Sequence, residues 1–350
     1  MKLSDFKFNV PEELIAQEPA RFRDESRLLV LHRKTGEIEH CVFKELCTFF
    51  DPHDLFIFND TKVFPAKIYG NKEKTNADVE VFLLRELNPD SKFWDTIVEP
   101  ARKIRIGNKL YFGEDNSLMA EVIDNTTSRG RTIRFLYDSS HDKFKSELMA
   151  MGHTPLPPYI HRRATEEDAE RYQCIFAKHE GAVMAPHAGL HFSREMFKRM
   201  EIYDLEWQFL TLHCGLGNYN EIDVEDLSKH RLDSEQMTVD STVVDSISEA
   251  RKRGSRVCAV GATTMRALET AATLDGYAKE YSGWSNKFIY PPYDFSICQA
   301  MVTNFHFPLT AMLMLTCAFG GYDQVMNAYD VAIKEKYRFG GYGDAMLIID

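Results

Sequence analysis

The sequence has no uninterrupted apolar stretch long enough to cross a membrane. Its most apolar segment runs from about Leu309 to Phe319, and Thr310 and Thr316 interrupt it. A spanning helix needs about 20 apolar residues, whereas a run of about 10–14 is typical of a buried core helix. The first residues, MKLSDFKFNVPEELI, also lack the apolar centre of a secretion signal. These absences predict a soluble, cytoplasmic protein without membrane contact.

Several common sequence signatures are missing too. The seven cysteines are scattered, odd in number and free of any C-x-x-C pair, which disfavours a disulfide framework or a zinc ribbon and predicts reduced thiols. No G-x-G-x-x-G follows a predicted strand, and neither G-x-x-x-x-G-K-[ST] nor G-x-S-x-G occurs. Dinucleotide, P-loop and serine-hydrolase chemistry therefore have little support.

The sequence has fewer basic than acidic residues. Lysine and arginine number 42 against 53 acidic residues, and the formal net charge is -11. Such a balance argues against a general polyanion binder. Two local basic clusters, EARKRGSR (249–256) and KEKYRF (334–339), leave room for a nucleic-acid contact, although solvated helix ends explain them equally well.

The patterns that are present predict two domains. Residues 27–42 read as a β-hairpin and residues 55–60 as a buried strand, after which six short β-like runs separated by turn residues follow up to about Asp138. Six regularly spaced short strands are typical of a small barrel. We predict an α/β core of mixed α+β character, formed by residues 1–61 and 151–350, with an inserted six-stranded β-barrel at residues 62–150.

The later part of the chain alternates helix and strand patterns. Helices are expected at 141–151, at 166–179 and at 239–253, where Gly254 would end the helix. A strand at 256–260, a turn at Gly261 and a new helix form an α/β unit. Pro308 suits the first position of a further helix, which would place Asn304 and His306 just before a helix N-terminus.

Polar residues collect where predicted strands end or helices begin. Catalytic groups favour such places, because loops at strand ends are held by rigid elements. Helix caps and buried core histidines explain any single segment, but five together suggest one site. The segments are FNDTKVFPAK (58–67), APHAGLHF (185–192), TLHCGLGNY (211–219), VGATTMRALE (260–269) and TNFHFPLTAMLML (303–315).

A metal centre is the weaker interpretation of the histidines. His187 and His191 lie on a glycine-containing loop rather than on a helix, and the H-E-x-x-H pattern of zinc hydrolases is absent. A metal-dependent hydrolase stays an alternative, to be decided by elemental analysis. Its chemically capable ligands are His187, His191, His213, Cys214, His230 and His306.

Together these segments resemble the S-adenosylmethionine:tRNA ribosyltransferase-isomerase family of queuosine biosynthesis. The resemblance covers essentially the whole chain, and its strings follow the family's order. Beyond the five segments above, they are ELIAQEP, SRLLVL, MGHTPLPPYI, ERYQCIFAK, AFGGY, AYDVAIKEKYRF and YGDAM.

The resemblance implies an α/β core with an inserted β-barrel, a monomeric state and a cytoplasmic location. It also implies transfer and isomerisation of the ribosyl part of S-adenosylmethionine onto an aminomethyl-deazaguanine base at the tRNA wobble position. The product would be epoxyqueuosine in tRNA, with adenine and methionine released. S-adenosylmethionine is then a substrate, and neither a metal nor a prosthetic group is expected.

The chemistry implied by this resemblance suggests a role for each candidate residue. The sulfonium acidifies the adjacent ribose methylene, so a base is needed, and His191 and His213 are the candidates. Asp60, Glu269 and Asp344 are candidate carboxylates beside the sulfonium or the developing ribosyl cation. Asn59, Thr263 and Asn304 are candidate hydrogen-bond donors to adenine or ribose, and Arg27 and Arg266 could hold the methionine carboxylate or a tRNA phosphate. Further candidate substrate-binding residues are Thr61, Gly189, Thr264 and His306.

The sequence also departs from the family pattern near the expected site. His187 replaces a threonine, Ala262 replaces another, and Asp233 replaces a histidine; Gly217-Asn218-Tyr219 and FGGYGD also differ. A diverged tRNA-binding relative with altered substrate or no turnover is therefore the alternative function. It would show salt-dependent tRNA binding without adenine release.

Overall fold

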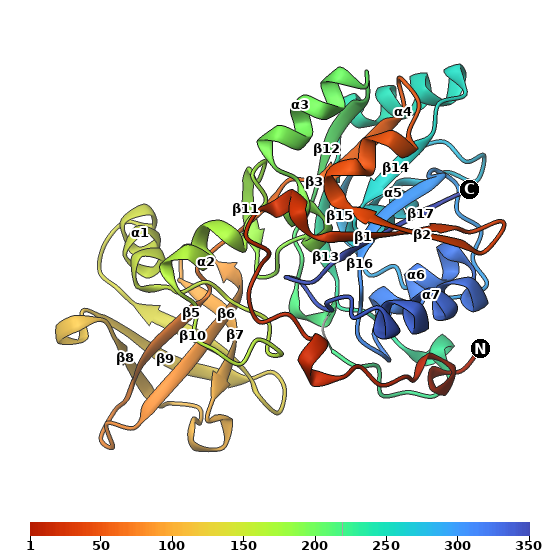
Figure 1. Ribbon diagram of the computed structural model, residues 1–350. Coiled ribbons are helices and arrows are strands. Elements are labelled where there is room, and N and C mark those ends of the chain that lie inside the picture. Colours follow the sequence, from red (N-terminus) through yellow and green to blue (C-terminus); the bar gives the residue numbers. More distant parts are fainter. Residues whose placement is uncertain (219) are drawn as a thin grey trace. The chain divides into compact units, whose positions relative to one another are not determined.

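The computed structural model describes residues 1–218 and 220–350, and the side chains of Asp115 and Asn218 lie outside that description. The chain forms two compact units (Figure 1). The core unit comprises residues 1–62, 157–162 and 173–350, and the barrel unit comprises residues 63–156 and 163–172. The barrel unit thus takes in residues that the sequence-based division at 61/62 and 150/151 assigns to the core.

A nine-stranded mixed sheet forms the centre of the core unit. Its strand order is β15-β13-β12-β3-β14-β16-β17-β1-β2. The predicted hairpin at 27–42 is confirmed as β1 and β2, and the buried strand at 55–60 as β3. The bounds are β1 Arg27–His32, β2 Glu37–Val42, β3 Leu55–Asn59, β12 Glu206–Leu212, β13 Glu235–Val239, β14 Val257–Val260, β15 Tyr281–Ser285, β16 Ala300–Asn304 and β17 Ala345–Ile349. A separate two-stranded pairing joins β4 (Thr61–Val63) and β11 (His179–Ala182).

Four neighbouring strands of this sheet run parallel. β3 pairs in parallel with β12 and with β14, and β14 pairs in parallel with β16. The carboxyl ends of these four strands therefore lie at one edge of the sheet. β17 is antiparallel to β16, and β1 is parallel to β17, so both of those strands begin at this same edge. We call it the carboxyl edge.

Five α-helices lie in the described part of the core unit, and the predicted helix at 239–253 is confirmed. The Asp240 side chain caps its start by accepting a hydrogen bond from the Val243 N–H, and Gly254 ends it in the left-handed conformation at φ 77°. Figure 1 shows α6 and α7 packed side by side. The bounds are α3 Arg194–Ile202, α4 Ser241–Arg253, α5 Ala262–Ala271, α6 Ala311–Gly320 and α7 Tyr322–Lys334.

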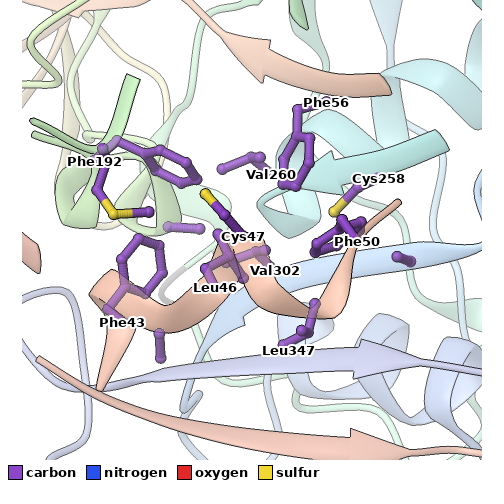
Figure 2. Close-up of a cluster of buried hydrophobic side chains, with 14 of the residues drawn as sticks. Phe43, Leu46, Cys47, Phe50, Phe56, Phe192, Cys258, Val260, Val302 and Leu347 are labelled. Carbon is purple, nitrogen blue, oxygen red and sulfur yellow. The ribbon is translucent and has the colours of Figure 1, made fainter. Parts of the chain in front are cut away.

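A short 3₁₀ helix closes one face of the sheet. Residues Phe43–Phe49 place Phe43, Leu46 and Cys47 against the strands (Figure 2). The strand side chains that face them come from β3, β14, β16 and β17 and are almost fully buried; they include Phe56, Val260, Val302 and Leu347. Truncating one of the buried phenylalanines to alanine typically costs about 3–5 kcal/mol, so this cluster contributes substantially to the stability of the core unit.

The barrel unit confirms the expected six-stranded β-barrel. Its strands close in the order β10-β7-β6-β5-β8-β9, all antiparallel. Two helices accompany the strands in this unit, and the first ends at Gly152 as predicted. The bounds are β5 Lys67–Lys72, β6 Asp78–Asn88, β7 Phe93–Glu99, β8 Lys109–Phe112, β9 Leu118–Asn125, β10 Gly130–Leu136, α1 His141–Met151 and α2 Glu166–Arg171.

Two sequence-based helix boundaries are wrong. α2 ends at Arg171, eight residues short of the predicted His179. α6 begins at Ala311 rather than near Pro308, because Leu309 has φ 61° and the Thr310 hydroxyl caps the helix. α5 begins directly after the predicted turn at Gly261, so Thr263 and Thr264 lie inside its first turn. Asn304 therefore ends β16, and His306 lies in the connection to α6.

Among the described residues, no helix combines the length and the apolar character that crossing a membrane requires. The most apolar one, α6, has ten residues.

Candidate active site

The carboxyl edge gathers four of the five polar segments. His213 follows β12, Asn59 ends β3, Gly261 follows β14 and Asn304 ends β16. The fifth segment forms the 3₁₀ helix His187–His191, which contacts β16. Crevices outside the carboxyl ends of parallel strands are where α/β folds bind ligands.

A pocket opens between three of these segments, 185–192, 260–269 and 303–315, whereas segments 58–67 and 211–219 contribute no residue to its lining. Its empty space is about 570 Å³ when the solvent at its mouth is counted. Of the described residues, none with an ionised side chain, aspartate, glutamate, lysine or arginine, lines it. The lining residues are Tyr159, Met184, Ala185, Pro186, His187, Ala188, Gly261, Ala262, Thr263, Thr303, Asn304, Phe305, His306, Phe307, Thr310, Met312 and Gly340.

His191 lies behind this lining and holds Asn304 in place. Its Nδ1 is 2.7 Å from the Ser26 hydroxyl, and its Nε2 is 3.2 Å from Oδ1 of Asn304. The Asn304 Nδ2 in turn donates to the carbonyl oxygen of Gly340 at 2.9 Å. Burial lowers the pKa of His191 to about 4, so the ring is neutral at pH 7. Both ring nitrogens are engaged, and His191 is therefore suited to positioning Asn304 rather than to accepting a proton.

Two further histidines lie in the pocket wall. Burial lowers the pKa of His187 and of His306 to about 3, and nearby His306 and His191 lower that of His187 further. Nε2 of His306 is 2.7 Å from the Thr303 hydroxyl, and its backbone N–H donates to the Tyr329 hydroxyl. These two rings therefore present uncharged polar edges to a ligand.

His213 has a different environment. It is half-buried, and its Nδ1 is 2.8 Å from the Thr61 hydroxyl. Burial lowers its pKa and His179 lowers it further, while the negative charge of Asp60 acts in the opposite direction. Within residues 1–218 and 220–350, its Nε2 has no hydrogen-bond partner. Of the two histidines proposed as bases, His213 alone offers a free ring nitrogen.

Arg266 pairs with Glu235 rather than with Glu269. Both members of the pair are buried, and Glu235 also accepts a hydrogen bond from the Gly215 N–H at 2.6 Å. Burial lowers the pKa of Arg266 to about 10, which leaves it charged at neutral pH. The pair fixes the loop after β12 to helix α5, so the charge of Arg266 is matched inside the protein.

The three candidate carboxylates are all engaged by the protein. Asp60 accepts from the Thr211 hydroxyl at 2.6 Å and lies 3.7 Å from His179. Glu269 accepts from the Tyr293 hydroxyl and from two backbone N–H groups, those of residues 296 and 297. Neither Asp60 nor Glu269 lines the pocket.

Asp344 and Arg27 meet at the carboxyl edge, where β17 and β1 begin. The Asp344 carboxylate accepts from the backbone N–H of Arg27 at 2.9 Å and of Arg338 at 2.8 Å. The Arg27 guanidinium stacks over the Tyr337 ring, 3.7 Å from its centroid, and donates to the Glu335 carbonyl.

The smaller candidate residues divide between pocket and scaffold. Thr263 lines the pocket, whereas Thr264 donates to the carbonyl of Val260 at the end of β14. Asn59 bonds both backbone groups of Leu212 and so ties β3 to the end of β12. Gly189 packs so closely on Cys174 that a Cβ would lie 2.7 Å from its sulfur.

The start of α5 faces the pocket with unpaired donors. Gly261, Ala262 and Thr263 line the pocket, and no side chain caps this helix. The backbone N–H groups of Ala262 and Thr263 have no acceptor in the described part of the chain. A helix start with free N–H groups attracts the negative end of a ligand.

The turn into α5 requires glycine. Gly261 has φ 98° and ψ 147°, a region that residues with a Cβ avoid. We expect Gly261→Ala to lower the free energy of unfolding by about 1–3 kcal/mol, measured by urea denaturation. Gly254→Ala, at a helix end with open space around it, is the matched control. It should cost less, about 1 kcal/mol; an equal loss at both positions would contradict a special constraint at Gly261.

Several pocket residues are absent from the sequence-based set. Tyr159 and Phe307 form an aromatic pair with ring centroids 4.6 Å apart, and the Tyr159 hydroxyl accepts from the Gly341 N–H. Met184 and Met312 also line the pocket. The position of Tyr159 after two prolines in HTPLPPYI was the available signal, since a stiffened segment holds its side chain in a fixed place. The methionines resemble ordinary core residues and carry no such signal.

The departures from the family pattern have distinct places. His187 and Ala262 line the pocket, and a Cβ on Gly341 would lie 2.6 Å from the His187 ring, so the glycine leaves room for that imidazole. Asp233 lies beside Gly217. Tyr219 and the Asn218 side chain lie outside the described residues. The part of the chain that is described contains no group of three or more potential metal ligands.

Comparison with known sequences supplies independent findings. The family model described as "Queuosine biosynthesis protein" matches residues 3–348. The S-adenosylmethionine:tRNA ribosyltransferase-isomerase of Parabacteroides distasonis is 66% identical over 349 residues, with the full length of both chains covered. The protein of the same name from Flavobacterium psychrophilum is 57% identical, again over both full lengths.

A solved structure is similar as well. The crystal structure of S-adenosylmethionine tRNA ribosyltransferase from Thermotoga maritima has 34% sequence identity to this chain and a TM-score of 0.56. The match covers 99% of this chain and 100% of that one.

Proposed function

This chain belongs to the queuosine biosynthesis protein family, and on that premise we propose that the pocket at its carboxyl edge binds S-adenosylmethionine for ribosyl transfer to tRNA. The activity is that of an S-adenosylmethionine:tRNA ribosyltransferase-isomerase. The single observation that carries the assignment of the site is the pocket with an uncharged lining at the carboxyl edge, where the ends of the parallel strands β14 and β16 contribute to its wall.

The proposed reaction moves the ribosyl group from S-adenosylmethionine to an aminomethyl-deazaguanine base at the wobble position. The bond from ribose to adenine and the bond from ribose to sulfur both break, and adenine and methionine leave. The ribosyl carbons rearrange and remain on the tRNA as the epoxy-ring group of epoxyqueuosine. The protein must therefore hold a cation, remove a proton beside sulfur and stabilise a leaving base.

Aromatic faces supply the place for the sulfonium. A cation is attracted to the face of a tyrosine or phenylalanine ring within about 6 Å. Tyr159 and Phe307 provide two such rings in a lining without ionised side chains. The methionine carboxylate would then lie toward the free N–H groups at the start of α5, because that end of the helix repels the sulfonium and attracts the anion.

We assign proton removal to His213. A general base works best when its pKa is near the working pH. The pKa values of His187 and His306, about 3, are far below neutrality, and both nitrogens of His191 are occupied. His213 has a free Nε2, and nearby Asp60 stabilises the imidazolium that proton transfer would create.

The neutral histidines have a complementary role. His191 fixes Asn304, and Thr303 contacts His306, so the amide and imidazole edges are preset before the ligand arrives. Groups held in this way stabilise charge developing on a leaving base without reorganising during the reaction.

The aromatic pair offers a direct prediction. Tyr159→Leu removes one ring face, and we expect the Kd for S-adenosylmethionine to rise about 5- to 30-fold, corresponding to about 1–2 kcal/mol of cation–π attraction. Tyr159→Phe keeps the face and loses only the hydroxyl contact to Gly341, so its Kd should rise less than about 5-fold. Isothermal titration calorimetry on both variants checks this. Equal weakening by both would assign the effect to the hydroxyl instead.

Adenine release tests the proposed function. Liquid chromatography should detect adenine from S-adenosylmethionine when tRNA carrying the aminomethyl-deazaguanine base is present, and none with tRNA carrying guanine at that position. tRNA binding without adenine release would support the diverged, non-catalytic relative instead. Since tRNA is the acceptor, we also propose a cytoplasmic location. The monomeric state stays a prediction, which light scattering decides.

A further inference from the structure

The barrel unit carries a basic surface at one of its ends. Three turns meet there: residues 72–76, 99–109 and 125–131. They contain eight lysine and arginine residues against two glutamates, in a chain whose formal net charge is -11. We call this surface the basic rim.

Hydrogen bonds join the three turns. Nζ of Lys72 donates to the Lys103 carbonyl at 2.7 Å, and the backbone N–H of Glu73 donates to the Lys109 carbonyl at 3.0 Å. Arg131, only 6% exposed, reaches from β10 to the carbonyl oxygens of Ala101 at 2.7 Å and Ile104 at 3.0 Å. The turn 101–105 is thus held on a fixed scaffold.

The charges of the rim are poorly neutralised. Arg131 has carbonyl oxygens as its partners, and these do not cancel its charge. Arg102, Lys103 and Arg105 are exposed, and none of the three forms an ion pair with a side chain that the structure describes. The ion pair found within the rim joins Arg129 to Glu99 at 2.6 Å.

The basic clusters that stand out in the sequence behave differently. In EARKRGSR three of the four cations pair with carboxylates, while Arg251 donates to the Gly276 carbonyl. In KEKYRF, Arg338 lies 3.7 Å from Asp344. Lys252, Arg253 and Arg256 pair with Glu249, Glu206 and Asp54 at 2.7, 2.8 and 2.7 Å. Paired charges have little attraction left for a polyanion. KEKYRF also has two exposed lysines, Lys334 and Lys336, which flank Glu335, but the rim holds more lysine and arginine residues and is the better candidate.

We propose that the basic rim is a docking surface for the phosphate backbone of the tRNA substrate. The inference rests on the proposed function, which supplies the polyanion. A strongly acidic chain that must bind RNA needs a local region of opposite sign, because phosphate contacts by lysine and arginine dominate such binding. Arg102, Lys103 and Arg105 are the residues most free to make those contacts.

The test compares two triple variants with equal loss of charge. Arg102→Ala/Lys103→Ala/Arg105→Ala removes the rim charges, and Arg251→Ala/Lys252→Ala/Arg253→Ala removes the same residue types from α4. Binding of fluorescently labelled tRNA is measured over 0.05–0.3 M KCl by anisotropy. We expect the rim variant to raise Kd roughly 10–100-fold at about 0.15 M salt and to reduce the slope of log Kd against log salt by about 2–3.

Kinetics separates this proposal from the proposed function. The rim variant should raise KM for tRNA and leave kcat at saturating tRNA and KM for S-adenosylmethionine unchanged. If the wild-type protein releases adenine but the rim variant binds tRNA no worse than the α4 control, the docking proposal is overturned alone. If the wild-type protein neither binds tRNA nor releases adenine, the proposed function fails.

Single substitutions guard against misfolding of the triple variant. Arg102 and Arg105 have exposed side chains. Arg102→Gln and Arg105→Gln should each reduce the slope of log Kd against log salt by about 0.7–0.9. An unchanged slope in both would overturn the proposal as well.

Discussion

Replacing His213 with glutamine should lower kcat for adenine release by about 10²–10⁴-fold, the usual contribution of a positioned general base. Glutamine can still contact the Thr61 hydroxyl that now faces Nδ1, but it cannot accept a proton near neutral pH. The Kd for S-adenosylmethionine should change less than about 3-fold, because glutamine is close to histidine in size and the lost interaction acts in the chemical step. Steady-state kinetics together with calorimetry separates the two effects.

The pH profile sharpens this prediction. The base must be neutral to act, and burial and His179 keep the pKa of His213 below its ordinary 6.5. For the wild-type protein, log(kcat/KM) should therefore stay level near pH 7 and fall only below about pH 6.5. The residual activity of His213→Gln should lack this acid limb.

A matched control is available at the opposite end of β3. His53 is exposed, and its ring contacts Glu206. His53→Gln should retain full activity and the wild-type profile. Full activity in His213→Gln, or loss of the acid limb in His53→Gln, would contradict the assignment of the base.

Mild acid should destabilise the protein strongly. His191 is buried with a pKa of about 4, and His187 and His306 have pKa values of about 3, against 6.5 for an ordinary histidine. As pH falls below 6.5, these histidines bind protons in the unfolded chain but not in the folded chain. The contribution of these histidines to stability is therefore fully present above pH 6.5 and is lost as pH falls toward 4.

The size of this effect follows from linkage. Between pH 6.5 and 5, one histidine that stays neutral in the folded chain lowers the free energy of unfolding by about 2 kcal/mol, since each pH unit contributes about 1.4 kcal/mol. His187 and His306 keep some exposed surface, which reduces their share. We expect a total loss of about 2–6 kcal/mol, measured by urea denaturation at pH 7.5 and pH 5.

Substitution of single histidines tests whether the buried rings cause the loss of stability in acid. His191→Gln should be less stable at pH 7.5, because Asn304 loses its ring partner, but it should lose about 2 kcal/mol less on acidification than the wild-type protein. His53→Gln should keep the wild-type pH dependence. If His191→Gln loses as much stability on acidification as the wild-type protein, the buried histidine is not responsible.

Local patterns in the sequence were sufficient for most of the fold. Alternating residues and turn signals predict the hairpin of β1 and β2 and all six barrel strands, because each strand carries its own periodicity. The helix 166–179 was wrong because its later residues, from Gln173, join the core unit in irregular structure. The start of α6 was wrong because Leu309 adopts a left-handed backbone that no composition rule anticipates.

The site was only partly visible in the sequence. Polar residues at strand ends predict that Asn59, His213 and Asn304 lie at one edge, as parallel pairing then places them. Which charges are already matched depends on contacts distant in the sequence. Arg266 meets Glu235, 31 positions earlier, and His191 meets Ser26, 165 positions earlier. Such pairs leave no periodic signal, so their residues looked free.

The most direct test of ribosyl transfer at the carboxyl edge follows two labels at once. S-adenosylmethionine carrying ¹⁴C in the ribose or in the methyl group is incubated with tRNA containing the aminomethyl-deazaguanine base, and the tRNA is then isolated. The ribose label should enter the tRNA in the wild-type protein and at least about 10²-fold more slowly in His213→Gln, while the methyl label leaves with methionine. Methyl label in the tRNA, or no ribose label with intact enzyme and tRNA, would contradict the account.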